Sequence, residues 1–558
     1  MLKSLFKKDN FKLLFFSVII FVCYTLFLTY SGYFEIGLLS DDYLNFIGAG
    51  NSSLFNKFTS SVPMINNLHF RPLYYISIDL SIWINQILNT AKDNFIVFRV
   101  ENMLFFYLAI FLTSVFFFKV TGKLYLSIFL LLMCLLYPNN INDICWTVGK
   151  NDLLCGVFII SSLLFTFLFI ENKTRYNYYL AGLFFVLGLL TKETSVIVPA
   201  VTILLVYLAY SKEKVFELKN LLIMEIFILI LYFSFRVYIL GVQPAEVVTK
   251  FQKPGLYSSA GVTFKAFISL LIPYDYLSIQ EYLNNFNLLF SIYAALLLIF
   301  VVAVLFIFVR TYNFRYLFVL SLIFVVSISP NLIAGYFRPQ LIFIPFLIIS
   351  FSLLLAAYKM GINLKFYAVT LLLILFIWGK LSFNLIQDWK LAYFNSVECI
   401  KKMTELELDT NKRNIFIGIP SRLRQASMLD YTIGAYNYWK YGEFKIKDKV
   451  TDLVLTGALD AASMNSEISV SKLSDNEFEL LTSGETQYFL RLDAASSKYK
   501  DKDIALRLSE KNLFKKPIDL KIRLISDDAD VYLYSENKFT MLKKNRSLSG
   551  FFENSDSK

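Results

Sequence analysis

The chain alternates between long apolar runs and short polar segments. Eleven of these runs are near the roughly 20 residues that cross a bilayer, and they predict membrane-spanning helices. They lie at about 11–30, 97–118, 123–137, 152–170, 176–190, 195–210, 220–240, 286–309, 316–335, 340–358 and 365–385. The runs at 123–137 and 176–190 are short. The pattern predicts a polytopic α-helical membrane protein with about 11 transmembrane helices.

Basic residues between the runs predict the orientation. Four lysines lie before or at the start of the first run, at positions 3, 7, 8 and 12, and no small-residue cleavage site follows it, so we expect a retained span with a cytoplasmic N-terminus. Threading the runs alternately puts five further basic groups on the cytosolic side: Lys119 and Lys123; Lys173 and Arg175; Lys212, Lys214 and Lys219; Arg310 and Arg315; Lys359 and Lys365. We therefore expect a multi-pass protein of a bacterial plasma (inner) membrane, in contact with membrane lipids.

Composition agrees with this class of protein. Of the 558 residues, 56% are hydrophobic and 17% aromatic, which excludes an ordinary soluble protein. The net charge of +11 comes from small basic groups spread between apolar runs rather than from one basic face, so we expect no nucleic-acid partner. The five cysteines are scattered and form no disulfide framework or zinc spacing.

The composition changes at about Gln387 to a polar, charged chain. Short alternating segments bounded by Asp, Ser and Gly predict strands, with helical patches between them. These segments are 414–419, 450–455, 487–492, 520–525 and 531–534. An odd number of spans would place this part outside the cytosol. We therefore divide the chain into a transmembrane catalytic domain at 1–386 and an extracytoplasmic α+β domain at 387–558.

Two of the loops expected outside the cytosol are long, at 32–96 and 241–285. The first contains an amphipathic stretch at 73–88, in which Tyr and Trp alternate with polar residues, as in segments that lie along a membrane interface. The second is rich in proline and glycine, and we expect an irregular segment that covers the site as a lid.

Four cations break the rule that outside loops carry few positive charges. Arg71, Lys150, Lys192 and Arg338 each lie near the outer end of a predicted span. A charge at that depth costs on the order of 1 to 3 kcal/mol unless it is paired or solvated. Any one of them alone is explained by snorkelling or a local ion pair. Together they predict a shared polar cavity.

Two adjacent carboxylates, Asp41 and Asp42, follow the first predicted span on the same side. Such a cavity suits the transfer of a sugar from a lipid phosphate, because the departing phosphate gains a second negative charge that Arg and Lys stabilise. A carboxylate is then needed to take the proton from the acceptor hydroxyl. Asp41 or Asp42 can supply it.

The order of the motifs resembles the GT-C superfamily of polyprenyl-phosphate-sugar glycosyltransferases, and most of all the protein O-mannosyltransferase branch with its bacterial homologues. The motifs that carry the resemblance are Asp41-Asp42, His69-Phe70-Arg71-Pro72-Leu73, the segment with Trp146, Gly149, Lys150 and Asp152, and Lys192-Glu193 before a span containing Pro199. It covers residues 13–200 well and reaches weakly to Arg338 and Pro345. The region from 387 onward is not covered.

The resemblance implies an extracytoplasmic active site, inversion at the anomeric carbon and a lipid-phosphate sugar donor. It implies that Asp41 or Asp42 is the catalytic base. It implies that Arg71, Lys150, Lys192 and Arg338 correspond to the basic positions near the donor phosphate, and Asp152 and Glu193 to their acidic partners. The chain departs from the pattern in having Lys150 where Arg is usual, which loses a two-pronged phosphate contact but keeps the charge.

Several assignments stay open at this point. His69, the single histidine, can bond a loop carbonyl or touch substrate, and Trp146 can pack on a sugar or lie in the interfacial belt, which we favour. Carboxylates with a histidine are compatible with a divalent metal, and both metal-dependent and metal-independent reactions remain open. The expected acceptor is a protein, lipid A or polysaccharide hydroxyl. The alternatives are a lipid-linked sugar flippase and an oligosaccharide ligase or polymerase.

Overall fold

A computed structural model divides the chain into two compact units. The helical unit comprises Met1–Glu35, Asn45–Tyr276 and Phe286–Ile386, and the sheet unit comprises Ile36–Leu44, Leu277–Asn285 and Gln387–Lys558. The structure describes residues 8–40, 42–59, 70–88, 95–210, 212–240, 256–273, 279, 288–310, 314–334, 337–362, 368–406, 413–429, 450–458, 464, 466–474, 477–483, 487–490, 498–500, 504–508, 519–524 and 529–543.

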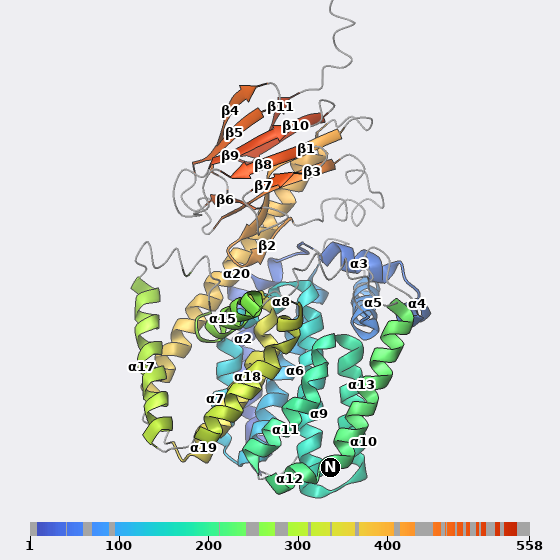
Figure 1. Cartoon of the computed structure of the whole chain (residues 1–558), viewed down its shortest axis with the longest axis vertical. Helices are drawn as coiled ribbons and strands as arrows, with labels where there is room; N and C mark the ends of the chain where they lie inside the picture. Colours follow the sequence, from blue (N-terminus) through green and yellow to red (C-terminus); the bar gives the residue numbers. More distant parts are fainter. Residues whose placement is uncertain are drawn as a thin grey trace, which may run out of the picture. The chain divides into compact units, whose positions relative to one another are not determined.

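Each of the eleven apolar runs falls on a helix of the helical unit (Figure 1). These helices are α2 (Lys8–Tyr30), α6 (Ile96–Thr121), α7 (Leu124–Leu136), α9 (Lys150–Asn172), α10 (Arg175–Thr191), α11 (Val198–Ala209), α13 (Lys219–Leu240), α17 (Leu288–Arg310), α18 (Phe314–Ala334), α19 (Phe343–Lys359) and α20 (Ala368–Thr404). Shorter elements connect them: η1 (Tyr33–Glu35), α3 (Asp42–Gly50), α4 (Leu54–Thr59), α5 (Pro72–Ile87), α8 (Asn139–Cys145), η2 (Thr147–Gly149), η3 (Glu193–Ile197), α12 (Lys212–Phe216), α15 (Leu256–Leu271) and η4 (Pro339–Ile342).

Length and apolar composition qualify seven of the described helices as membrane spans. The number becomes eight if α7 and α8, which meet at a bend of 64°, form one broken span. α10, with 17 residues, and α11, with 12, are shorter than each of the seven, which have at least 20 residues. A helical protein with several apolar helices of membrane-crossing length is therefore established, and the total of eleven crossings and their orientation stay predictions.

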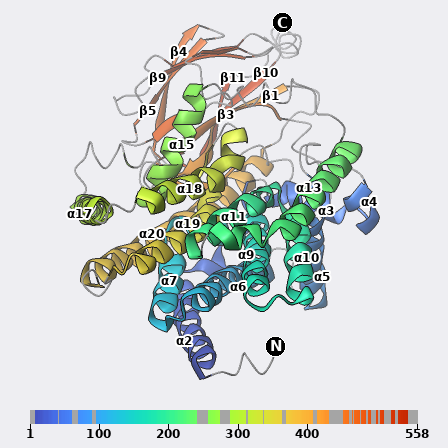
Figure 2. The ribbon, with the colours of Figure 1, turned by 60° about the horizontal axis from the view of Figure 1, so that its bottom comes forward.

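Helix α9 is the centre of the helical unit. Its candidate span, counted from Thr147, is 78% buried, and α6 and α10 lie beside it in both views of the ribbon (Figures 1 and 2). Glycines let α10 pack closely, because a Cβ at Gly182 would lie 2.6 Å from Met224 Cε and one at Gly188 would lie 2.5 Å from Ser195 Oγ. Small residues at such crossings bring helix backbones together in membrane bundles.

The two long loops contain more helix than their composition indicates. Helix α5 agrees with the amphipathic stretch expected at 73–88. In the loop at 241–285 the expectation of an irregular segment is wrong for α15, which has 16 residues. Val262, Ala266 and Ser269 are buried at a spacing of four and three residues, so one helical face packs inward. Because prolines lie on either side of α15, the sequence indicated an irregular segment and this helical spacing was not recognised.

The sheet unit holds two β-sheets. A six-stranded sheet has the order β11-β10-β1-β3-β6 with β2 paired to β1, and a five-stranded sheet has the order β4-β5-β9-β8-β7. The strands are β1 (Arg413–Leu423), β2 (Ala426–Ser427), β3 (Val450–Ala458), β4 (Ile468–Ser474), β5 (Glu477–Thr482), β6 (Gln487–Leu490), β7 (Lys498–Lys500), β8 (Ile504–Leu508), β9 (Asp519–Leu524), β10 (Ala529–Ser535) and β11 (Lys538–Lys543). β1 lies between β3 and β10 and is parallel to both.

All five segments expected to form strands do so, as β1, β3, β6, β9 and β10. Helical patches between the strands were also expected, yet from 413 to 543 the described residues contain helix only at Met464. The helix of the sheet unit is instead the last part of α20. Its buried residues recur at helical spacing and form one face against the unit: Trp389, Ala392, Ser396, Cys399, Ile400 and Met403.

Candidate functional site

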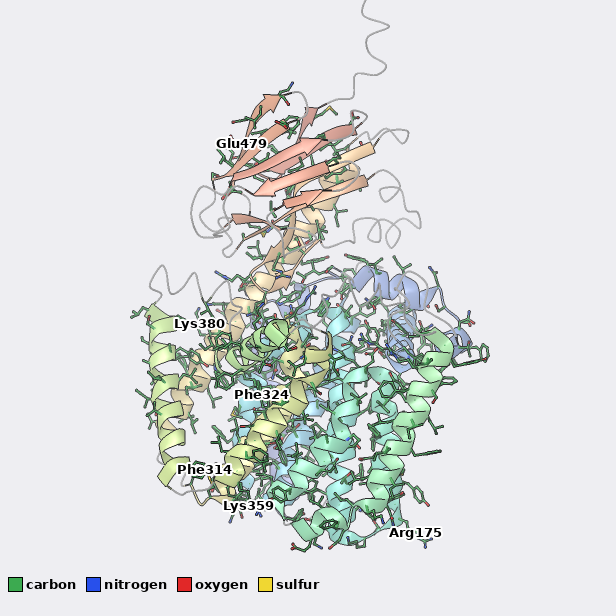
Figure 3. All side chains as sticks on the ribbon, in the orientation of Figure 1. Arg175, Phe314, Phe324, Lys359, Lys380 and Glu479 are labelled. Atoms are coloured by element: carbon green, nitrogen blue, oxygen red, sulfur yellow. The ribbon has the colours of Figure 1, made fainter. Side chains whose placement is uncertain are left out.

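Charged side chains gather at one end of the helical unit. α9 starts at Lys150, and the antiparallel α10 returns the chain to the same end at Lys192. At the other end of the unit lie Arg175 and Lys359 (Figure 3). Because α9 has 23 residues, the two ends are about 33 Å apart. The charged cluster at the first end is therefore separate from the basic end that holds Arg175 and Lys359. The cluster consists of Arg71, Arg99, Glu101, Asp143, Lys150, Asp152, Lys192 and Glu193.

Two ion pairs lie next to each other through the neighbouring residues Lys192 and Glu193. Lys192 Nζ lies 2.6 Å and 2.5 Å from the two carboxyl oxygens of Asp152, on the first turn of α9. Arg71, which precedes α5, contacts Glu193 Oε2 through Nε at 2.9 Å and Nη2 at 2.8 Å. Asp152 also acts electrostatically on Arg71. The structure thus brings together four residues that the sequence assigned to one site.

Arg71 keeps hydrogen-bonding capacity beyond this pair. Nε and Nη2 both point at one oxygen of Glu193, and Nη1 has no partner within the described residues. Burial opposes the charge of Arg71, but Glu193 and, more weakly, Tyr75 and Asp152 raise its pKa above the ordinary value for arginine. Burial also raises the pKa of Tyr75 to about 12, with Arg71 opposing the shift. Arg71 therefore stays charged, and Tyr75 keeps its proton.

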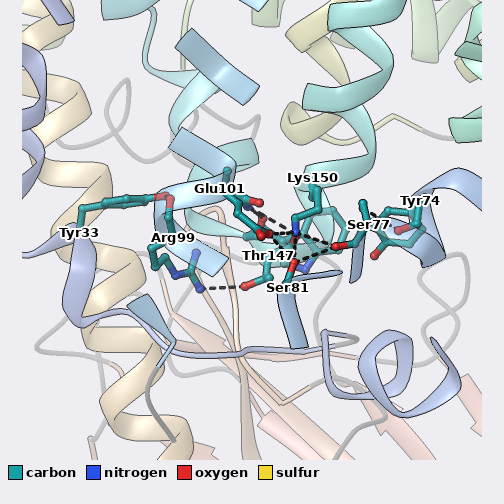
Figure 4. A network of polar contacts seen from close by, with 10 residues as sticks. Tyr33, Tyr74, Ser77, Ser81, Arg99, Glu101, Thr147 and Lys150 are labelled. Atoms are coloured by element: carbon teal, nitrogen blue, oxygen red, sulfur yellow. Dashed lines mark hydrogen bonds and ion pairs between the residues drawn. The ribbon is translucent and has the colours of Figure 1, made fainter. Parts of the chain in front are cut away.

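Lys150 is differently placed, because its ammonium is fully engaged (Figure 4). Lys150 Nζ contacts Glu101 Oε2 and Ser81 Oγ closely and lies 3.4 Å from the carbonyl oxygen of Ser77. Ser81 also bonds to Glu101. An ammonium has three N–H donors, and all three are directed at these groups. The Lys150 side chain is 1% exposed. Lys150 therefore joins the start of α9 to α5 and α6.

Arg99 holds the connection between α8 and α9. Its Nη1 donates to the carbonyl oxygens of Ile144, at 3.1 Å, and Cys145, and its Nη2 to Thr147 Oγ1 at 3.0 Å. The Tyr33 hydroxyl donates to the Arg99 carbonyl at 2.8 Å, and the guanidinium lies 5.9 Å from the Tyr33 ring centre (Figure 4). A wholly buried arginine thus orders the backbone that leads into Lys150 and Asp152.

Asp143, on α8, is the most unusual carboxylate of this region. It is 0% exposed, and neither carboxyl oxygen has a hydrogen-bond partner among the described residues. Asp152 and Lys192 are the charged groups that act on it. Its backbone is fixed by Gly149, where a Cβ would lie 2.2 Å from the Asp143 carbonyl oxygen. A buried acceptor without a donor costs about 1 to 3 kcal/mol, so a ligand that supplies a donor would be favoured here.

The remaining predicted site residues have different outcomes. Asp41 and His69 lie outside the described residues. Asp42 begins α3 in the sheet unit, is 0% exposed, and its Oδ2 accepts from the Leu39 backbone N–H at 2.9 Å. Arg338 is exposed before η4 and makes no ion pair with any described residue. That Asp41, Asp42 and Arg338 share a site with the other cations stays a prediction.

Trp146 caps the C-terminal end of α8. Its ring is only partly exposed, and its indole Nε1 is buried without a hydrogen-bond partner in the described part of the chain. Its carbonyl oxygen accepts from Asn102 Nδ2 at 3.2 Å. A belt tryptophan usually presents its N–H to headgroups or water, so this geometry leaves both expectations for Trp146 open.

Sequence reasoning missed three charged residues of this cluster: Arg99, Glu101 and Asp143. A signal for the first two was present, because both charges lie inside the apolar run at 97–118. Ionisable residues inside a predicted span are functional or paired by default. Asp143 was missed because the polar residues before it, Asn139 and Asn140, indicated a loop. In the structure these asparagines are buried and belong to the helix α8.

No group of three or more His, Cys, Asp or Glu residues that could hold a metal ion occurs in the described ranges. Comparison with models of protein families and with curated proteins finds no match to this chain. The chemistry of the cluster therefore has to be argued from its own residues.

Lys150 and Glu101 should behave as one structural unit. We expect Lys150→Met to lower the free energy of unfolding by about 3 to 5 kcal/mol, because Glu101, whose side chain is only 15% exposed, loses its cationic partner. The double variant Lys150→Met/Glu101→Leu should recover most of this loss. Thermal unfolding in detergent measures both. Lys173→Met, in the exposed pair with Glu217, is the control and should change stability by less than about 0.5 kcal/mol. Equal destabilisation by Lys150→Met and Lys173→Met would contradict the assignment.

Proposed function

We propose that the protein is an inverting membrane glycosyltransferase that moves a sugar from a polyprenyl-phosphate carrier to an extracytoplasmic acceptor hydroxyl. The observation that supports this most is the set of three buried or half-buried cation–carboxylate pairs at one end of the helical unit: Arg71–Glu193, Lys192–Asp152 and Lys150–Glu101. Their residues come from α5, α6, α9 and the junction of α10 with η3.

Stability alone does not account for three such pairs. Replacing a buried ion pair by apolar side chains of similar volume is often neutral or stabilising by about 1 to 4 kcal/mol. Charges within apolar helical bundles instead mark sites that bind or move charged groups. A lipid phosphate is a charged group that reaches such a bundle from the membrane. The motif order that resembles the GT-C superfamily includes all of these residues except Glu101.

Arg71 and Lys192 suit a phosphate in different ways. Arg71 retains Nη1 for a second contact, and a planar guanidinium matches two phosphate oxygens. Lys192 adds a positive charge next to it, already oriented by Asp152. When the sugar leaves, the phosphate gains negative charge, so these contacts strengthen in the transition state and accelerate the reaction. Lys150, whose donors are all engaged, keeps α9 in place.

The acidic pair supplies the base in this proposal. Asp42 Oδ2 accepts from Leu39 N–H, and Asp42 N–H donates to the Leu39 carbonyl at 3.0 Å, so the Asp42 side chain closes a local turn. Such a bond holds the side chain in one orientation. We therefore assign proton removal from the acceptor to Asp41 and the ordering of the loop to Asp42.

Arg71→Ala should lower turnover by about 100-fold and weaken donor binding, because the developing phosphate charge loses its fork-shaped partner. Arg71→Lys, which keeps the charge, should lie between this variant and the natural enzyme. Purified protein with a labelled polyprenyl-phosphate sugar measures both effects. Lys173→Ala, at the basic end of the helical unit, is the matched control. Natural turnover in Arg71→Ala would remove the phosphate role.

Asp41→Asn should lower turnover by about 100-fold or more while donor binding survives, since an amide does not accept the acceptor's proton. Asp42→Asn should have a smaller effect, because an amide oxygen still accepts from Leu39 N–H. The same donor with saturating acceptor measures both variants. Full activity in both would reject the assignment of the base.

Asp143 fits a contact to the donor sugar, because sugar hydroxyls supply the hydrogen-bond donors that its buried oxygens lack. Asp143→Asn should raise the KM for the donor by about tenfold, because one acceptor oxygen is replaced, and should leave the melting temperature unchanged, because the amide has the shape of the carboxyl group. Glu225→Gln is the control, since Glu225 on α13 is another wholly buried carboxylate whose oxygens have no hydrogen-bond partner in the described chain. A KM shift shared by both variants, or absent from both, would contradict this contact.

A further inference from the structure

The segment that carries the acidic pair belongs to the sheet unit, although some 340 residues separate it from that unit's main part. Ile36–Leu44 clusters with Gln387–Lys558 rather than with the helices on either side of it in sequence. The backbone N–H of Ser40 donates to the carbonyl of Met428, just after β2, at 2.9 Å. The residue before Asp41 is therefore tied directly to the C-terminal part of the chain.

Side chains of the segment are buried along its described length. Ile36, Leu38, Leu39 and Tyr43 are each at most 3% exposed. Leu38, Leu39 and Tyr43 line one small hollow together with residues of the sheet unit. Those residues are Val397 and Ile400 on α20, and Met428 and Leu429 after β2. Apolar contact of this kind fixes a segment more firmly than one hydrogen bond does.

Gly37 shows how close the approach is. A Cβ at this position would lie 2.2 Å from Cε2 and 2.4 Å from Cζ of the Tyr393 ring on α20. Carbon atoms that are not bonded to each other do not approach so closely, so any side chain at position 37 requires the ring or the segment to move. The sequence Ile36-Gly37-Leu38 is therefore matched to the surface of α20.

The surface that receives the segment is itself braced. Arg424, in the turn between β1 and β2, contacts both carboxyl oxygens of Asp388 on α20, at 2.7 Å and 2.8 Å. Its backbone N–H donates to the Ala458 carbonyl at 2.8 Å, and its φ is +47°, which a non-glycine residue adopts at a cost. This ion pair joins α20 to the β1–β2 turn, and Met428 and Leu429, just after β2, line the hollow that receives Leu38 and Leu39.

Backbone geometry at Ser40 connects the docked segment to Asp42. Ser40 has φ +52°, and the mutual hydrogen bonds of Leu39 and Asp42 close the turn on either side of it. Positive φ at a serine is uncommon and persists only where the surroundings determine it. The bond from Ser40 to Met428 is one such determinant.

We propose that the sheet unit is the positioning device for Asp41 and Asp42, and that Gly37 and Tyr393 are positioning residues for the transferase reaction. The catalytic half of this inference rests on the proposed function, because there the acidic pair supplies the base. The docking half does not. A misplacement of about 1 Å in a catalytic group costs on the order of 100-fold in rate.

The test uses the full chain with Gly37→Ala, Gly37→Ala/Tyr393→Ala and the control Gly50→Ala, where an added Cβ has ordinary room 3.9 Å from Ile82. We expect Gly37→Ala to lower kcat by about 100-fold with the donor KM within about twofold of its natural value. Amide hydrogen exchange over residues 38–43 should become faster, and exchange in α9 should not change. The double variant should restore both, and Gly50→Ala should change neither.

The outcomes separate the two halves. Unchanged exchange over residues 38–43 in Gly37→Ala overturns the docking, whatever the protein catalyses. Faster exchange with natural kcat overturns the positioning role. Faster exchange and lower kcat without recovery in the double variant also overturn the role of the contact between Gly37 and Tyr393. If Asp41→Asn and Asp42→Asn are both fully active, the proposed function fails while the exchange result still decides the docking.

Discussion

Pairing of buried charges is the constraint on which the helical unit depends. Arg71, Lys150 and Lys192 lie where apolar helices begin or end, and each is matched by one carboxylate from a different element. An unpaired ion in such surroundings would cost several kcal/mol, so the pairs also set the relative positions of α5, α6, α9 and α10. The packing of these helices and the pairing of their charges therefore depend on each other, so a change in one alters the other.

The pairs differ in how many N–H donors their cations keep for other partners. Lys150 has none left and joins three helices, whereas Arg71 Nη1 has no partner among the described residues. Asp143 adds two buried carboxyl oxygens without a described hydrogen-bond partner, to which our proposal assigns the hydroxyls of the donor sugar. Cation donors and carboxylate acceptors are what a phosphate-linked sugar needs at its two ends.

Much of this could be predicted from the sequence, where the signal was local. Apolar runs predicted the helices, alternation predicted five strands, and cations in the wrong loops led to Arg71, Lys150 and Lys192. Contacts between distant residues could not be predicted in this way. Glu101 was concealed inside an apolar run, the face of α15 lay between prolines, and nothing in Ile36–Leu44 indicated that it packs against α20. Such partners depend on three-dimensional packing, which periodicity does not encode.

The most direct test of the central claim is mass spectrometry of lipid-linked sugars and envelope glycans in cells that lack this chain. If the charged cluster neutralises a departing lipid phosphate, carrier-bound monosaccharide accumulates on the outer leaflet and one extracytoplasmic product loses its sugar. Unchanged lipid-linked sugars, or accumulation confined to the cytosolic leaflet, would contradict the account.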